Sequence, residues 1–190
     1  VTAHIRGAKR PLLRGLRTVT EFTIDFGEAL LDQGATGIFY ATQVATKDFL
    51  TSEQYDEFCL PFDMRVLGAL SHSDMTVLHL HSEKKGDEIP FERIAKYRVD
   101  ALNWWDRGGR PTLVDAKRLY GDKFCLIGGL DHTSTLHHGS PSEVRREARE
   151  AIGQGGHEGF MLGPGCTVAA RAKLENFEAA IEAVGSSVVP

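Results

Sequence analysis

Cysteine is scarce in this sequence of 190 residues, and the three that occur, at positions 59, 125 and 166, are an odd number. A low, odd count predicts no disulfide framework, so we expect a reducing, cytoplasmic environment. Long hydrophobic runs are also missing. No stretch approaches the roughly 18 apolar residues of a membrane span, and no signal peptide precedes the first predicted element. The sequence therefore predicts no membrane partner.

Clustered positive charge is nearly absent as well. The chain carries 22 Lys and Arg against 26 Asp and Glu, a net charge of -4, and its one basic run lies in residues 1–17. A surface helix or loop accounts for that run better than nucleic-acid binding, which needs a denser basic face. We expect no nucleic-acid partner.

A glycine-rich phosphate-binding fingerprint is missing after the first predicted strand. This absence argues against a dinucleotide-binding or P-loop motif. The sequence does contain a regular alternation of short apolar runs and amphipathic stretches, which predicts five strands, each followed by a helix. The predicted strands are residues 37–41, 76–81, 99–104, 123–128 and 159–162.

Helix signals separate these strands. Thr18 and Glu21 have capping-box spacing, which predicts a helix that begins at Thr18 and carries an apolar stripe within residues 22–30. A second capping box begins at Thr51, and Pro61 predicts a kink or break inside the helix that follows. Shorter helices are expected over residues 87–97, 112–120, 140–152 and 174–184.

Polar residues gather directly after the predicted strands. In chain order they are Gln43, His79, His81, Asn103, Asp131 and Cys166. A (β/α)8 barrel builds its active site from the carboxyl ends of several strands at one face, whereas a doubly wound sheet concentrates its site near one switch point. A polar residue after every strand favours the barrel.

Five β/α units are fewer than the eight of a closed barrel, which usually takes about 250 residues. We therefore expect residues 1–190 to form one α/β domain that contains the last five units of a (β/α)8 TIM-barrel type fold. The open sides would leave strand edges and apolar surface uncovered. We expect either a C-terminal fragment of a longer protein or a chain completed by a partner, such as a second copy in a homo-oligomer. The start at Val1 fits a fragment or a processed chain.

His79 and His81 form the most distinctive pair in the chain. Successive side chains of a strand point to opposite faces, so these two imidazoles share one face at a strand end. Such a pair can begin a divalent metal site. The alternative is one surface histidine and one hydrogen-bonded core histidine, and the spacing alone does not decide between them.

Seven short motifs occur in a fixed order. They are GATGIF (34–39), LTSEQYDEFCLPFD (50–63), VLHLH (77–81), ALNW (101–104), IGGLD (127–131), GFMLGPGC (159–166) and ENF (175–177). Together, over roughly residues 20–184, they resemble the uroporphyrinogen decarboxylase superfamily, which also contains zinc-dependent corrinoid methyltransferases. The resemblance implies a (β/α)8 barrel, in agreement with the alternation of strands and helices.

The resemblance is closer to the methyltransferase branch, in which an H-x-C strand end and a later cysteine hold zinc. By resemblance, His79 corresponds to the histidine, His81 stands in place of the first cysteine, and Cys166 corresponds to the later one. This implies a Zn²⁺ site that activates a thiol or similar small-molecule substrate for methyl or alkyl transfer. It also implies a corrinoid carried by a partner protein. The exchange of histidine for cysteine makes the site less negative.

Two alternative functions remain open. The decarboxylase branch needs no metal and binds porphyrinogen carboxylates through residues in the first part of the barrel, which this chain does not include. Pro164 stands where that branch tends to have histidine, and Tyr40 where an acidic residue is common. The other alternative is a non-catalytic partial barrel that binds or pairs with another chain.

The remaining strand-end residues are candidates for catalysis. Asp131, Asn103 and Gln43 are expected to hydrogen-bond the substrate or to orient the second ring nitrogen of a metal ligand. Capping of the loops that follow is the alternative for each. The histidines at 132, 137 and 138 are expected in an exposed loop, and one of the tryptophans at 104 and 105 is expected to pack between a strand and a helix.

Overall fold

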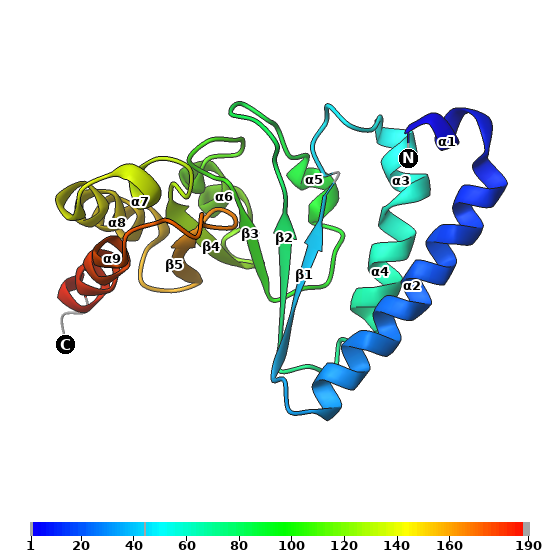
Figure 1. Cartoon of the computed structure of the whole chain (residues 1–190), viewed down its shortest axis with the longest axis horizontal. Helices are drawn as coiled ribbons and strands as arrows, with labels where there is room; N and C mark the ends of the chain where they lie inside the picture. Colours follow the sequence, from blue (N-terminus) through cyan, green and yellow to red (C-terminus); the bar gives the residue numbers. More distant parts are fainter. Residues whose placement is uncertain (1, 44, 188–190) are drawn as a thin grey trace.

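Five parallel strands form one sheet in which the order of the strands follows the order of the chain, β1-β2-β3-β4-β5 (Figure 1). The computed structural model describes residues 2–43 and 45–187. Its elements are α1 (Thr2–Gly7), α2 (Lys9–Asp32), β1 (Gly37–Thr42), α3 (Ser52–Phe58), α4 (Leu60–Ala69), β2 (Met75–Leu80), α5 (Phe91–Ile94), β3 (Ala101–Trp104), α6 (Leu113–Tyr120), β4 (Cys125–Leu130), α7 (Thr135–His138), α8 (Pro141–Gly155), β5 (Phe160–Pro164) and α9 (Leu174–Ser187).

The sequential strand order decides between the two folds that the alternation allowed. A doubly wound sheet reverses its strand order at a switch point. Here each strand pairs in parallel with the next one along the chain, as in the wall of a barrel. The prediction of an α/β fold with five units of a (β/α)8 barrel is confirmed. In the described part of the chain β1 and β5 each pair on one side only.

The register places two of the predicted polar residues, His79 and Asn103, on one side of the sheet. Ala41, His79, Asn103, Ile127 and Met161 lie in one row across the five strands. Side chains that share a row of a sheet point to the same face. His79 and Asn103 therefore lie side by side on the face of the sheet that the helices do not cover, which we call the inner face. They lie near the carboxyl ends of their strands.

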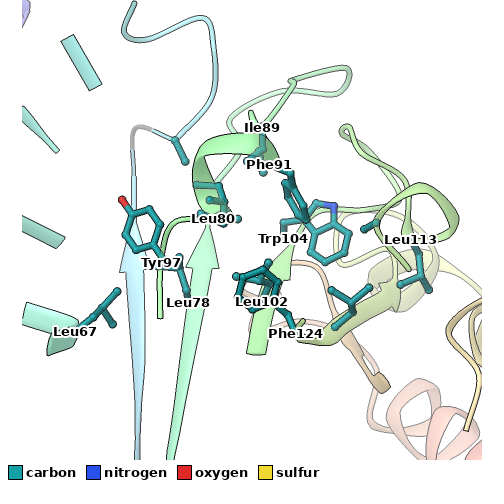
Figure 2. Close-up of a cluster of buried hydrophobic side chains, with 14 of the residues drawn as sticks. Leu67, Leu78, Leu80, Ile89, Phe91, Tyr97, Leu102, Trp104, Leu113 and Phe124 are labelled. Carbon is teal, nitrogen blue, oxygen red and sulfur yellow. The ribbon is translucent and has the colours of Figure 1, made fainter. Parts of the chain in front are cut away.

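The opposite face of the sheet is covered by helices. Leu78, Leu102 and Leu126, one residue out of phase with the polar row, are fully buried in the main apolar cluster. They pack with side chains from the helices α4, α5, α6 and α8, and Figure 2 shows part of this cluster. Trp104 lies at its centre, edge-on to Phe91 at a ring separation of 5.0 Å. One of the two tryptophans thus packs between strand and helix, as predicted.

The first long helix begins nine residues earlier than predicted. We expected the helix to start at a capping box formed by Thr18 and Glu21, but α2 runs from Lys9 to Asp32, and the Thr18 hydroxyl donates to the carbonyl of Arg14 inside it. Residues 9–17 are mostly Leu, Lys and Arg, which favour helix, and Pro11 lies in the first turn, where it removes no helical hydrogen bond. The basic segment 1–17 is therefore helical throughout most of its length.

The apolar stripe of α2 is exposed. Its members are Val19, Phe22, Phe26 and Leu30, which we call the edge stripe, and the two phenylalanines are 70% and 57% exposed. The face of α2 that packs on α4 is instead formed around Thr20 and Gly27. On α9, at the other end of the molecule in Figure 1, Ile181 is 71% exposed. The edge stripe lies on the β1 side of the sheet, and the exposed face of α9 lies on the β5 side. The described sheet ends at these two strands, and no described element covers either face.

The predicted helix break at Pro61 is confirmed. Thr51 and Gln54 form a complete capping box at the start of α3, which ends at Phe58. A new helix, α4, begins at Leu60 with Pro61 in its first turn. Proline cannot continue a helix from the preceding turn, but it is well suited to begin one. The same reasoning holds for α8, where Ser140 and Glu143 form the predicted capping box.

Several predicted boundaries are wrong by a few residues. Instead of a helix over residues 87–97, only Phe91–Ile94 is helical, because Asp87 binds the loop amides of Glu83 and Lys84, and Ile89 donates its amide to Arg110. Strands β3 and β4 start later than expected, since their first paired residues are Ala101 and Cys125. The last helix continues past Gly185.

A buried polar network joins β1 to the helices behind it. The carboxylate of Asp63 on α4 accepts hydrogen bonds from the hydroxyls of Tyr40 at 2.7 Å and Tyr97 at 2.8 Å. The hydroxyl of Tyr97 lies 2.8 Å from that of Tyr55 on α3. Burial raises the pKa of Asp63, and the two tyrosine hydrogen bonds act in the opposite direction.

Within the described residues, no helix is both long enough and apolar enough to cross a membrane.

Candidate metal centre

Three side chains from distant parts of the chain converge at the carboxyl end of the sheet. His79 belongs to β2, His81 follows that strand by one residue, and Cys166 lies in the turn that follows β5. One nitrogen of each imidazole and the thiol sulfur all lie within 4.8 Å of one another. The structure therefore brings together the three residues that the sequence predicted as metal ligands.

The distances suit a tetrahedral ion. Cys166 Sγ lies 3.4 Å from His79 Nε2 and 3.5 Å from His81 Nδ1. Sulfur and nitrogen ligands at the usual zinc bond lengths, placed at tetrahedral angles, would be about 3.5 Å apart. A single thiol proton could be donated to only one of the two nitrogens. The two sulfur–nitrogen distances thus match those of a zinc site, and two imidazoles with one thiol are ligands that zinc prefers.

Asn103 determines which nitrogen of His79 is free. The Asn103 amide nitrogen donates to the carbonyls of Ile127 at 3.0 Å and Pro164 at 3.1 Å. Its amide oxygen is therefore the atom that lies 2.6 Å from His79 Nδ1, and it can only accept. His79 must donate Nδ1–H, which leaves the lone pair on Nε2 directed at Cys166. This is the pattern in which a hydrogen bond to one ring nitrogen orients the other toward a metal.

The environment of His79 also favours a neutral ring. The side chain is 5% exposed, and its ring stacks against Phe39 at 5.7 Å. Burial lowers the pKa of His79, the hydrogen bond with Asn103 acts against this effect, and the neighbouring His81 adds to it. A neutral imidazole is the form that binds a metal, so His79 is prepared as a ligand before any ion arrives.

His81 has a corresponding oxygen partner that the sequence reasoning missed. Its Nε2 lies 3.4 Å from a carboxylate oxygen of Glu83, while its Nδ1 faces Cys166. Carboxylates commonly orient metal-binding histidines in this way. The Glu83 side chain is 55% exposed, so its interaction with His81 is weakened by solvent. The signal that could have revealed Glu83 is its spacing, two residues beyond His81 at the end of the same strand.

The three candidate ligands line a cavity of about 720 Å³ on the inner face of the sheet. Its lining residues come from all five strand ends: Phe39, Ala41, Gln43, His79, His81, Asn103, Ile127, His132, Pro164, Cys166, Thr167 and Val168. Phe39, Ile127 and Val168 give the cavity apolar surface beside the polar cluster. Because the three candidate ligands line this cavity, a small substrate that enters it could reach the fourth position around an ion bound by them.

The structure places two of the three predicted catalytic residues at the cavity. Asn103 and Gln43 line the cavity, and Gln43 is exposed. Asp131 is not among the lining residues. One of its carboxylate oxygens accepts hydrogen bonds from Thr133 and from the amide of Ser134. Burial acts to raise the pKa of Asp131, but these hydrogen bonds outweigh it and hold the pKa below its ordinary value. The visible role of Asp131 is to shape the loop after β4.

His132 differs from the prediction of an exposed loop histidine. It is half-buried, lines the cavity, and packs edge-on against Trp105 at a ring separation of 5.1 Å. His137 and His138 form part of the short helix α7, away from the cavity. The sequence could not separate these three histidines because the loop that carries them has no periodic pattern.

Asp106 is a second buried carboxylate near the same end of the sheet. Its oxygen accepts the amide of Gly129 at 3.0 Å. Burial raises the pKa of Asp106 to about 6, while the Gly129 hydrogen bond and the positive charge of Arg107 act in the opposite direction. Arg107 itself donates to the carbonyls of Gly129 and Glu147 and pairs with Glu150. This set of bonds fixes the loop after β3 to α8.

Fold and site together define a partial (β/α)8-type barrel with a candidate metal centre at the carboxyl ends of its strands. Comparison with known families agrees with this class. Residues 7–187 match the family described as "Uroporphyrinogen decarboxylase (URO-D)". The chain belongs to the uroporphyrinogen decarboxylase family.

Curated relatives place the chain nearer to one part of that family. It is 25% identical over 171 residues to the methylated-thiol–coenzyme M methyltransferase of Methanosarcina mazei, covering 90% of this chain and 43% of the relative. It is 29% identical over 163 residues to the methylcobamide:CoM methyltransferase MtaA of Methanosarcina barkeri, covering 86% of this chain and 45% of the relative. A uroporphyrinogen decarboxylase of Pseudoalteromonas translucida is 29% identical over 160 residues, covering 80% and 42%. The chain spans less than half the length of these relatives.

A solved structure supports the fold. A methyltransferase from Methanosarcina mazei superimposes with a TM-score of 0.77 at 24% identity, covering 90% of this chain and 48% of that protein. The described strands and helices therefore correspond to about half of a larger protein of the same fold.

Proposed function

We propose that this chain forms the metal-binding half of a zinc-dependent methyl or alkyl transferase whose acceptor is a small thiol. The observation that carries the proposal is the convergence of His79 Nε2, His81 Nδ1 and Cys166 Sγ within 4.8 Å at the mouth of the cavity. The similarity to relatives named methylated-thiol–coenzyme M methyltransferase and methylcobamide:CoM methyltransferase supports methyl transfer.

Each of the three ligands has its own role in holding zinc. His79 is held by Asn103 with its free nitrogen directed at the site, and His81 is supported by Glu83. Cys166 supplies a sulfur from the turn that follows β5, the last strand of the described sheet. Zinc bound there would lower the pKa of a thiol that approaches it and present the sulfur as a thiolate nucleophile.

The cavity then has to bring the thiol and the methyl donor together. The apolar side chains of Phe39, Ile127 and Val168 offer surface on which the carbon atoms of the thiol can pack. In the transfer, the sulfur of the substrate forms a bond to the methyl carbon, and the bond between that carbon and its donor breaks with the electron pair remaining on the donor. A corrinoid on a partner protein, as the name methylcobamide indicates for the relative, is the donor we propose.

Metal analysis of the purified chain tests the proposal. We expect about one zinc per chain in the wild type and a large loss in Cys166→Ser and His79→Ala, since three protein ligands are needed for a stable site. Cys125→Ser is the matched control, because Cys125 is also a half-buried cysteine but lies outside the cavity. Full zinc content in Cys166→Ser, or methyl transfer from methylcobalamin to 2-mercaptoethanol by metal-free protein, would contradict the proposal.

Decarboxylation of a porphyrinogen without metal is the second candidate. It is favoured by the family match and by the similarity to a uroporphyrinogen decarboxylase. This candidate predicts that zinc removal leaves activity intact. The close approach of two imidazoles and a thiol has no use in that reaction, and for that reason we rank it below thiol methylation.

A non-catalytic barrel segment is the third candidate, and the edge stripe favours it. Phe22 and Phe26 on α2 expose apolar surface that a second polypeptide could cover. This candidate predicts a stable complex and no zinc uptake. Metal analysis therefore separates it from the first candidate.

A further inference from the structure

His132 has an unused nitrogen on the cavity side. The residue directly follows β4 and lines the cavity together with His79 and His81. Its Nδ1 is buried and has no hydrogen-bond partner in the described part of the chain. Its Nε2 is bonded to no described residue and is not among the buried unpaired atoms, so it is accessible, on a residue that lines the cavity. The ring thus presents one free polar atom to any occupant.

The ring is held by a rigid neighbour. His132 packs edge-on against Trp105, with an angle of 70° between the ring planes. Trp105 is 8% exposed, and Gly108 lies so close to its indole that no side chain could replace the glycine hydrogen there. A fixed aromatic platform restricts the direction in which Nε2 points. Preorganised polar groups of this kind bind ligands at low entropic cost.

The surroundings make His132 a neutral donor. Burial lowers the pKa of His132, the nearby carboxylate of Asp131 acts against this effect, and His79 and His81 add to it. A neutral imidazole has one N–H. In either tautomer the buried Nδ1 has no partner among the described residues, and this costs free energy. The indole N–H of Trp105, on which the ring packs, is also buried and without a partner there, so a hydrogen on Nδ1 would place a second unpaired donor beside the first. The tautomer with the hydrogen on Nε2 is therefore favoured, and its donor is available to an occupant of the cavity.

Other polar groups in the cavity are less suited to this task. Both polar ends of the Asn103 amide are already bonded. Gln43 and Thr167 line the cavity on exposed positions, and no lysine or arginine is among the described lining residues. His132 is the remaining lining donor that is half-buried and fixed by packing.

We propose that His132 is a substrate-binding residue whose Nε2–H donates to a hydrogen-bond acceptor, such as a carbonyl or an oxyanion, on the thiol that occupies the cavity. This inference rests on the proposed thiol-binding function of the same cavity.

Two uncharged probes of similar shape test the inference. In 3-mercaptopropionamide a carbonyl and an amide occupy the positions that two methyl groups occupy in 3-methylbutane-1-thiol. Binding of each to the zinc-loaded full chain can be measured by calorimetry. We expect the wild type to prefer the amide by about tenfold, as one hydrogen bond in a partly buried site provides. His132→Phe should lose this preference and keep its zinc, and His132→Gln, which retains a donor, should keep part of it.

His138→Phe is the matched control, because His138 lies on the short helix α7, six positions after His132, and outside the cavity. An unchanged tenfold preference in His132→Phe would overturn the inference and leave the proposed function intact. Equal binding of both probes by the wild type would also overturn it. A wild-type chain that binds zinc but neither thiol, or that binds no zinc, would instead refute the proposed function, and this inference with it.

Discussion

The amide oxygen of Asn103 lies 2.6 Å from Nδ1 of His79, and the two carbonyls that hold the Asn103 amide nitrogen leave this oxygen no role except that of acceptor. The pair therefore fixes the tautomer of a proposed metal ligand from the neighbouring strand. Asn103 is placed to act on the candidate site through His79, which is the second of the two roles predicted for it.

Replacing Asn103 by leucine should weaken zinc binding. The change removes the acceptor of Nδ1–H and lets the His79 ring exchange tautomers, and loss of such a partner typically costs about 10- to 100-fold in metal affinity. Competition with a chromophoric chelator measures the affinity. Asn176→Leu is the matched control, because Asn176 is also a buried amide that donates to two carbonyls, but it lies on α9. Equal zinc affinity in Asn103→Leu and the wild type would refute the positioning role.

The stability of the chain should depend on pH through Asp106. Burial raises the pKa of Asp106 to about 6 from its ordinary value of 3.8, so the folded chain retains a proton that the unfolded chain releases above about pH 4. The free energy of unfolding therefore falls as the pH rises from about 4 to 6, by up to about 3 kcal/mol from this group. In Asp106→Asn, which keeps the acceptor for Gly129, this fall should be absent.

Urea denaturation between pH 4 and 7 measures the effect as the difference between wild type and variant. Asp122→Asn, which changes an exposed aspartate, is the control. Parallel pH profiles for the wild type and Asp106→Asn would show that Asp106 does not titrate in this window.

The hydroxyl of Tyr97 should contribute measurably to stability. It donates to Asp63 and contacts the hydroxyl of Tyr55, so Tyr97→Phe leaves a buried carboxylate oxygen without its donor. We expect a loss of about 1–3 kcal/mol in the free energy of unfolding. Tyr120→Phe, at a partly buried tyrosine that packs on the main cluster, should change the free energy of unfolding by less than about 0.5 kcal/mol. Similar values for the two variants would mean that the network adds nothing beyond packing.

The edge stripe should bind hydrophobic probes. Phe22→Gln with Phe26→Gln removes large apolar groups that are 70% and 57% exposed, so the double variant should bind less of the dye ANS without loss of thermal stability. The control is Val114→Gln with Leu119→Gln on α6, where two comparably exposed apolar residues lie away from the sheet edges. A larger decrease in the control variant would show that the edge stripe is not the main apolar surface.

Much of this fold follows from local patterns. Short apolar runs predicted every strand, and the capping boxes at Thr51 and Ser140 predicted two helix starts. The start of α2 was missed because the motif at Thr18 lies inside a longer run of helix-forming residues. The exposure of Phe22 was also missed, since a helical stripe shows which residues share a face but not what covers that face.

The candidate site was predictable to a smaller extent. Alternation along a strand was enough to pair His79 with His81, but only the resemblance connected them to Cys166, 87 positions after His79. The direction of the Asn103 amide depends on the carbonyls of Ile127 and Pro164, which come from two other strands. No local pattern contains that information, and the same is true of the packing that places His132 in the cavity.

The span between the ligands has a consequence for the whole chain. His79 and Cys166 are 87 positions apart and enclose the strands β3, β4 and β5. An ion bound by both would bind the folded chain, in which these side chains converge, far more tightly than the unfolded chain, in which they are separated. Its binding would add to the free energy of unfolding, by about 2.7 kcal/mol when the free ion is at 100 times its dissociation constant. Removal of the ion by a chelator would then lower the resistance of the strands β2 to β5 to unfolding.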